Sequence, residues 1–121
     1  MKTTQLIAAL TTIATTNPDG YTVNAQTLEP IKSGYAVAVA ETQNSFGPEG
    51  LAKVIKYVQD HSEIAAFGGW YNSDDKQFYF DATIIVATKL EAIELAKLNK
   101  QLAFFCLDNG KSYNQDGTER R

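Results

Sequence analysis

Residues 64–86, IAAFGGWYNSDDKQFYFDATIIV, constrain the fold more than any other part of the chain. Two apolar, aromatic-rich runs flank residues 72–76, where Asn, Ser and Asp favour a turn because their side chains hydrogen-bond to nearby backbone. In the second run Phe78 and Phe80 alternate with Tyr79 and Asp81, and successive strand residues point to opposite faces. The segment therefore predicts a β-hairpin with one face in the core and a mostly polar face opposite.

The remaining elements can be placed around this hairpin. Apolar residues recur at helical spacing in three segments, residues 3–16, 48–60 and 88–100. Short apolar runs predict three further strands, at residues 21–24, 34–42 and 102–107. Thr3 or Thr4 is expected to cap the first helix, and Thr88 with Glu91 forms a capping box for the third.

From residue 34 onward the predicted order is strand, helix, strand, strand, helix, strand. This is the order of the split βαβ, or ferredoxin-like, α+β fold, a two-layer sandwich, here over residues 34–107. In it the strand at 77–86 is central beside 34–42, and the other two strands of the core lie outside them. Right-handed crossovers place both helices on the face that carries Phe78 and Phe80.

The ends of the chain are predicted as additions to this core within one domain, residues 1–121. Residues 1–33 supply the N-terminal helix, expected to cover part of the other sheet face, and a short strand that extends one edge. Residues 108–121 are polar and are expected to form a frayed tail. A chain of this length is long enough to bury a core of its own.

Charge and composition exclude several functions. The formal net charge is −3, and both Arg residues, Arg120 and Arg121, are the last two positions. Because Arg makes the bidentate contacts to phosphate and to guanine edges, we expect no duplex-DNA binding. No run approaches the ~20 apolar residues of a membrane helix. Lys2 and a mildly apolar segment begin the chain as in a signal peptide, but four Thr in positions 3–12, Gln5 and the missing cleavage pattern make a signal peptide the less expected alternative. With Cys106 as its single cysteine, the chain is expected to be cytoplasmic, with no membrane partner.

Four aromatic residues are candidates for a binding surface: Trp70, Tyr71, Tyr79 and Tyr35. Such residues on the uncovered face of a ferredoxin-like sheet can stack nucleic-acid bases, although the basic and aromatic ribonucleoprotein signature is absent. Gly68-Gly69 beside Trp70 has two interpretations. Paired glycines can allow a ligand to approach closely; alternatively they mark a bulge, with Trp70 packed under the N-terminal helix, which is the more common environment for Trp.

Asp81 is the remaining candidate, an acid within an apolar strand. It has no acid partner at a fixed spacing, so the interpretation as a general base competes with a side chain that faces solvent beside Thr83. His61 is the sole His and Cys106 suits a core position, so neither a zinc set nor a Cys–His pair is expected. We therefore expect no catalytic residues, no metal and no cofactor.

Five segments carry a resemblance to known proteins: GYAVAV (34–39), GGWYN (68–72), FYFD (78–81), EAIELAKLN (91–99) and QLAFFCLDNG (101–110). Over residues 34–110 the chain resembles a loosely defined group of small uncharacterised proteins from phages and other bacterial mobile elements. The resemblance implies an accessory role in a mobile element. It supplies no activity and no catalytic residues.

Three functions follow as hypotheses. The first is a non-enzymatic binding protein acting by protein–protein contact, including inhibition of a host or defence factor, with a homodimer through an exposed edge strand as a related case. The second is a small-molecule or nucleotide binder with an aromatic pocket around Trp70. The third is an enzyme with a site centred on Asp81.

Overall fold

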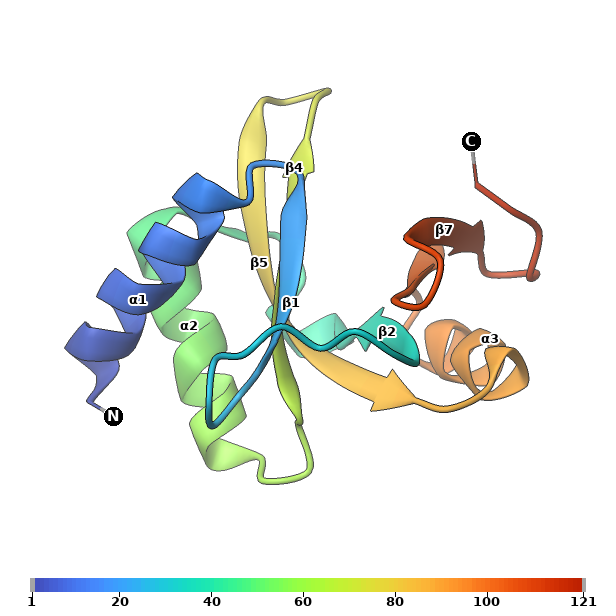
Figure 1. Cartoon of the computed structure of the whole chain (residues 1–121), viewed down its shortest axis with the longest axis horizontal. Helices are drawn as coiled ribbons and strands as arrows, with labels where there is room; N and C mark the ends of the chain where they lie inside the picture. Colours follow the sequence, from blue (N-terminus) through green and yellow to red (C-terminus); the bar gives the residue numbers. More distant parts are fainter. Residues whose placement is uncertain (1, 121) are drawn as a thin grey trace.

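The computed structural model describes residues 2–120 of the chain (Figure 1). Its elements, in chain order, are α1 (Thr3–Thr16), β1 (Gly20–Asn24), β2 (Tyr35–Ala38), the short 3-10 turn η1 (Ala40–Thr42), β3 (Ser45–Phe46), α2 (Gly47–Asp60), β4 (Ala66–Asn72), β5 (Gln77–Val86), α3 (Lys89–Leu98), β6 (Ala103–Cys106) and β7 (Lys111–Asn114). The predicted α+β class is confirmed, and the hairpin at 64–86 is present as β4 and β5.

The strands form one antiparallel sheet in the order β1-β4-β5-β2-β6-β7, and β3 also pairs with β5. As predicted, β5 is central beside β2, with β4 and β6 outside them, and β1 extends the β4 edge. The pairing of β4 with β5 is continuous through Gly68↔Asp81 and Gly69↔Phe80. The paired glycines therefore lie in a regular strand, and the bulge expected there is absent.

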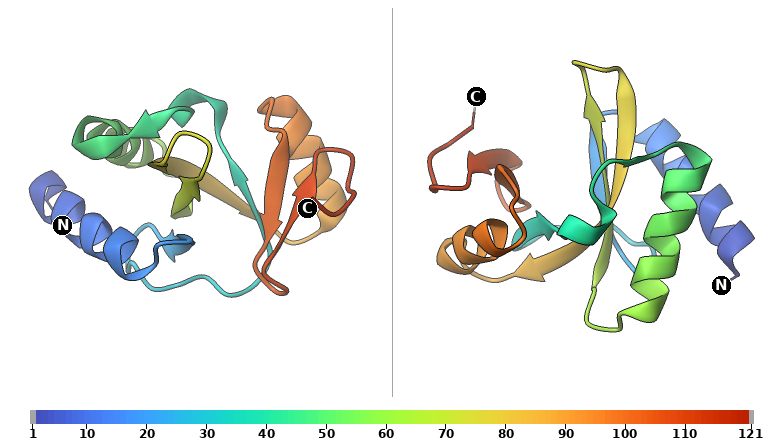
Figure 2. Two further views of the ribbon diagram at one scale, coloured as in Figure 1. Left: turned by 90° about the horizontal axis from the view of Figure 1, so that it is seen from above. Right: turned by 180° about the vertical axis from the view of Figure 1, so that it is seen from behind.

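One face of the sheet, the covered face, is packed against all three helices. Leu10 of α1 and Ile55 of α2 are buried against Phe67 and Phe80 of the hairpin. Farther along the sheet, Ala92 and Ala96 of α3 are buried with Val37 of β2 and Phe104 of β6. The register places these four strand residues on the same side, so the prediction that Phe80 faces the helices is confirmed. Figure 2 shows α1 and α2 beside one end of the sheet and α3 beside the other.

The N-terminal helix was expected on the other face, and this prediction is wrong. In the structure α1 packs beside α2 and β1, with Leu6 and Leu10 in the same buried cluster as Leu51 of α2. The cause is the available apolar surface: the covered face offers aromatic and branched side chains, whereas the opposite face carries Thr22 in β1 and Asp81 in β5. Among residues 2–120, no helix packs on this opposite face, called the open face below.

Local hydrogen bonds explain two boundaries that differ from the prediction and one that agrees with it. The strand predicted at 34–42 ends at Ala38, because the Thr42 side chain accepts a hydrogen bond from the Ala82 backbone N at 3.0 Å and the chain turns through η1. Lys2, not Thr3 or Thr4, precedes α1, and its backbone N donates to Gln5 Oε1 at 3.0 Å. The capping box of α3 is confirmed, with Glu91 N donating to Thr88 Oγ1 at 3.2 Å.

Both outer strands of the sheet are covered by their own chain. Along β1, Asn24 N donates to Glu29 O and Ile31 N donates to Thr22 O. Residues 112–121 were expected to fray, but residues 112–114 belong to β7, and Arg120 N donates back to Ser112 O; residue 121 lies outside the described residues. The neighbouring segments thus occupy backbone groups that an edge strand would otherwise offer to another chain.

Among residues 2–120, no helix combines the length and the apolar character needed to cross a membrane.

Candidate functional site

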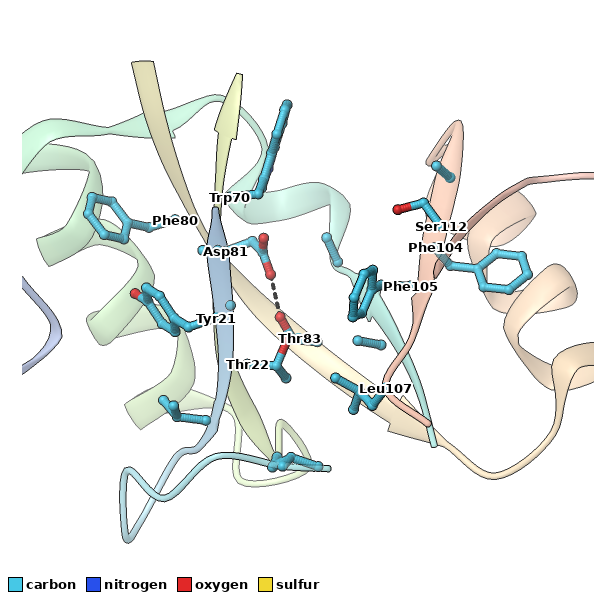
Figure 3. A pocket seen from close by; sticks show the side chains of 18 of the residues that line it. Tyr21, Thr22, Trp70, Phe80, Asp81, Thr83, Phe104, Phe105, Leu107 and Ser112 are labelled. Atoms are coloured by element: carbon cyan, nitrogen blue, oxygen red, sulfur yellow. Dashed lines mark hydrogen bonds between the residues drawn. The ribbon is translucent and has the colours of Figure 1, made fainter. Parts of the chain in front are cut away.

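A groove of about 1130 Å³ runs along the open face of the sheet. One wall comes from β1 and β4 with the adjoining part of β5, and the other comes from β6 and the segments that follow it (Figure 3). Trp70 and Asp81 project into it from one side, and Phe105 and Leu107 project from the other. The groove is a large concave surface lined by aromatic side chains, and therefore the first place to look for a binding function.

Small residues keep the groove open along its floor. Ala36 and Ala38 of β2 point to the open face, because they alternate with Tyr35 and Val37, which face the helices. In β4, Ala66 is level with Ala38, and Gly68, the next residue on this face, has no side chain. The floor is therefore close to the backbone itself, and a bound group can approach the strands directly.

The adjacent glycines Gly68 and Gly69 make room for side chains on opposite faces of the sheet. A Cβ on Gly69 would lie 2.4 Å from the Tyr21 ring and 2.6 Å from the Phe78 ring on the covered face. A Cβ on Gly68 would lie 2.5 Å from both Asp81 Oδ1 and Thr83 Oγ1 on the open face. Gly69 thus allows the stacking of Tyr21 on Phe78, and Gly68 leaves room for the Asp81 carboxylate.

Trp70 is exposed on the open face. Its side chain is 46% exposed, and its ring stacks on Tyr79 with centroids 5.1 Å apart and planes 18° from parallel. Phe46 of β3 meets the other side of Tyr79 edge-on at 5.6 Å. The interpretation that Trp70 packs under the N-terminal helix is therefore wrong, because the β4 register turns Trp70 away from the face that α1 covers.

Two of the predicted aromatic residues belong to the other face. Tyr71 pairs with Phe78 and so points to the covered side, where it is 46% exposed. Tyr35 also points to the helices, with its ring 6.0 Å from that of Phe104. Of the five predicted binding residues the structure brings together Trp70, Tyr79 and Asp81, and it separates Tyr71 and Tyr35 from them.

Asp81 holds a carboxylate in the groove wall without a cationic partner. Thr83 Oγ1 donates a hydrogen bond to Asp81 Oδ1, and no salt bridge within residues 2–120 involves Asp81. Loss of water around the carboxylate raises the pKa of Asp81 to about 6, against the smaller opposing effect of the Thr83 hydrogen bond. The group is therefore ionised at neutral pH in surroundings that solvate it poorly.

Sequence reasoning missed Phe105, which lines the groove, and Phe46, which packs against Tyr79. Phe46 lies in a two-residue strand preceding α2, too short for any periodicity to show. Phe105 lies in LAFFCL, where every residue is apolar, so no alternation tells which of Phe104 and Phe105 faces the helices. The structure buries Phe104 and leaves Phe105 37% exposed toward the groove.

Residues 2–120 bring together few side chains that could bind a metal or catalyse a reaction. Within residues 2–120, no three His, Cys, Asp or Glu side chains gather where they could hold a metal ion. His61 follows α2 and stacks on Tyr57 at 3.9 Å, while Cys106 is buried in β6. What the groove offers is shape, aromatic surface and two carboxylates, Asp19 and Asp81. Comparison with protein-family models, with curated proteins and with solved structures finds no match for this chain.

Proposed function

We propose that this chain is a non-enzymatic binding protein that acts by protein–protein contact and takes a segment of its partner into the groove. One observation carries the proposal: both walls hold large aromatic side chains that the fold leaves exposed, Trp70 at 46% and Phe105 at 37%. Trp is the side chain most characteristic of binding hot spots, and exposed apolar surface that lines a concavity is typical of interaction sites.

The covered edges of the sheet support contact through the groove. The segments around Glu29 and Arg120 already occupy backbone groups of β1 and β7, so a homodimer through an edge strand gains no support. The face carrying the groove lacks any such cover. A partner segment lying there would bury the exposed aromatic surface instead of competing with hydrogen bonds that already exist.

The strand order extends the proposal to the fold type, and the sequence resemblance extends it to the biological setting. The neighbouring strands β4-β5-β2-β6, with α2 and α3 on one face, support a ferredoxin-like core extended by β1 and β7. The resemblance of residues 34–110 to mobile-element proteins supports a cytoplasmic accessory role, including inhibition of a host or defence factor.

The test is selection of peptides from a random display library on immobilised protein, followed by affinity measurements with variants. We expect the selected peptides to bind Trp70→Ala and Phe105→Ala at least about tenfold more weakly, as hot-spot truncation does. Leu90→Ala is the control, because Leu90 is an exposed apolar residue of α3 that does not line the groove. Failure to select any binder, or binders sensitive only to Leu90→Ala, would contradict the proposal.

A small-molecule or nucleotide ligand is the second candidate, and the stacking geometry of Trp70 favours it. One ring face rests on Tyr79, and the strand on the other side of β4 presents only Gly20 at that level. A planar ring can stack on such a face. Because Trp70 is the sole Trp, its fluorescence reports directly on this site. A saturable change with one member of a nucleotide and metabolite panel would favour this function.

A further inference from the structure

One part of the site proposed above, called the hollow below, lies beside Trp70 and holds the Asp81 carboxylate; Asp19, next to Gly20, is a second acid in the groove lining. Trp70 is flanked on the open face by two glycine positions, Gly20 across the strand pair and Gly68 two residues back along β4. Asp81 is opposite Gly68, which makes it the diagonal neighbour of Trp70 on the same face. Such neighbours lie about 7–8 Å apart, a distance that a single side chain of a ligand can bridge.

The charges around the hollow are not balanced within the described chain. Asp81 accepts one hydrogen bond, from Thr83, and forms no salt bridge within residues 2–120. Arg120 is the only cation among the described residues that line the groove, and its Nη1 lies 3.4 Å from Asn114 Oδ1 on the far wall. A poorly solvated carboxylate without a counter-ion favours a ligand that brings the positive charge with it.

The shape of the hollow selects among cations. A guanidinium is planar, stacks on aromatic faces and pairs with a carboxylate through two parallel hydrogen bonds. The ring face of Trp70 that does not rest on Tyr79 provides the flat surface, Gly20 presents no side chain across from it, and Asp81, whose carboxylate fits over Gly68, provides the acceptor at its margin. An ammonium group would pair with the Asp81 carboxylate but, because it is not planar, would not stack on the Trp70 ring.

We propose that the hollow formed by Trp70, Gly20, Gly68 and Asp81 binds an arginine side chain of the partner segment. This inference rests on the proposed function, because it assigns the chemistry of one residue in the segment that the groove receives. It makes Asp81 the determinant of specificity and Trp70 the stacking platform. It also accounts for the exposed Trp and the unpaired acid with a single ligand group.

The test uses the full-length protein and three matched sets of display-derived peptides. One set carries Arg at a fixed position, the second carries citrulline there as its neutral isostere, and the third carries Lys. Quenching of Trp70 fluorescence gives the affinity with the wild-type protein and with Asp81→Asn, a substitution that keeps the side-chain size. Calorimetry gives the affinity with Trp70→Ala, which lacks the fluorophore.

We expect Arg peptides to bind at least about tenfold more tightly than citrulline peptides, and Asp81→Asn to reduce that preference to less than about twofold. Equal binding of Arg and citrulline peptides to the wild-type protein would overturn the arginine assignment and leave the groove proposal standing. Equal binding of Lys and Arg peptides would also overturn it, since an ammonium cannot stack as a plane. Absence of binding in all three sets would overturn both.

Discussion

Phe80 and Asp81 are neighbours on β5 and lie on opposite faces of the same sheet. Phe80 is 8% exposed within the cluster that α1 and α2 cover. Asp81 lies in the wall of an open groove, where its carboxylate has one hydroxyl partner and a raised pKa. The covered face satisfies the requirements of packing, and the open face retains an exposed Trp and an unpaired charge. Features that cost stability without packing benefit are characteristic of binding sites.

The same contrast occurs one strand away, at Gly68 and Gly69. Gly69 is required by rings that pack together on the covered side, and Gly68 by a carboxylate and a hydroxyl on the open side. Substitutions on the two faces should therefore separate effects on folding from effects on binding. The predictions below use that separation, and they run from the largest expected effect on the free energy of unfolding to the smallest.

Phe67→Ala tests the covered face. Phe67 is 1% exposed and belongs to the main core cluster, so truncation leaves a cavity and is expected to lower the free energy of unfolding by ~3–5 kcal/mol. Urea denaturation followed by circular dichroism measures the change. A loss below about 1 kcal/mol would show that the covered face is not the packed one.

Asp81→Asn tests the charge on the open face. The pKa of Asp81 rises from 3.8 to about 6 on folding, so the folded state binds the proton more tightly and the wild-type protein loses stability as the pH rises from about 4 to 6. The full shift corresponds to ~3 kcal/mol, and contact with water reduces it to about 2 kcal/mol. Asn should therefore stabilise the protein by that amount at pH 8 and not at pH 3.5, as measured by urea denaturation at both values. Equal stability of both proteins at pH 8 would show that Asp81 is well solvated.

Gly69→Ala and Gly68→Ala form a matched pair across the sheet. At Gly69 the new methyl group meets two packed rings, so overpacking is expected to cost ~1–3 kcal/mol. At Gly68 it meets the ends of the Asp81 and Thr83 side chains, which can rotate into the groove, so we expect a smaller loss of stability and a larger loss of binding. Thermal unfolding and peptide affinity of both variants measure the two effects. If Gly68→Ala lost more stability and Gly69→Ala lost more binding, our assignment of each glycine to a face of the sheet would be wrong.

Trp70→Ala should affect stability least. The side chain is already 46% exposed, and the variant loses the stacking on Tyr79, which is worth about 1 kcal/mol. Urea denaturation should place it close to Tyr71→Ala, whose side chain has the same exposure on the other face. A loss above about 3 kcal/mol would mean that Trp70 belongs to the core.

The sequence predicted the core strand order and the face that the helices cover, because β5 alternates clearly between Phe78, Phe80 and their more polar neighbours. It did not predict which residues share the groove. Tyr71 and Tyr35 look like Tyr79 as isolated aromatics, and only the pairing register shows that they point to the helices. Phe105 is hidden in a run without polar residues. The placement of α1 depends on a contact with α2 between segments distant in sequence, which periodicity does not specify.

Accessibility of Trp70, free and in complex with a selected peptide, is the most direct test of the open face as a binding groove. Acrylamide quenching of the single Trp measures it without a label. We predict efficient quenching in the free protein and at least about threefold weaker quenching in the complex, because a bound segment covers half-exposed side chains at an interface. Equal quenching in both states, or a Trp70 already protected in the free protein, would contradict the groove as the binding surface.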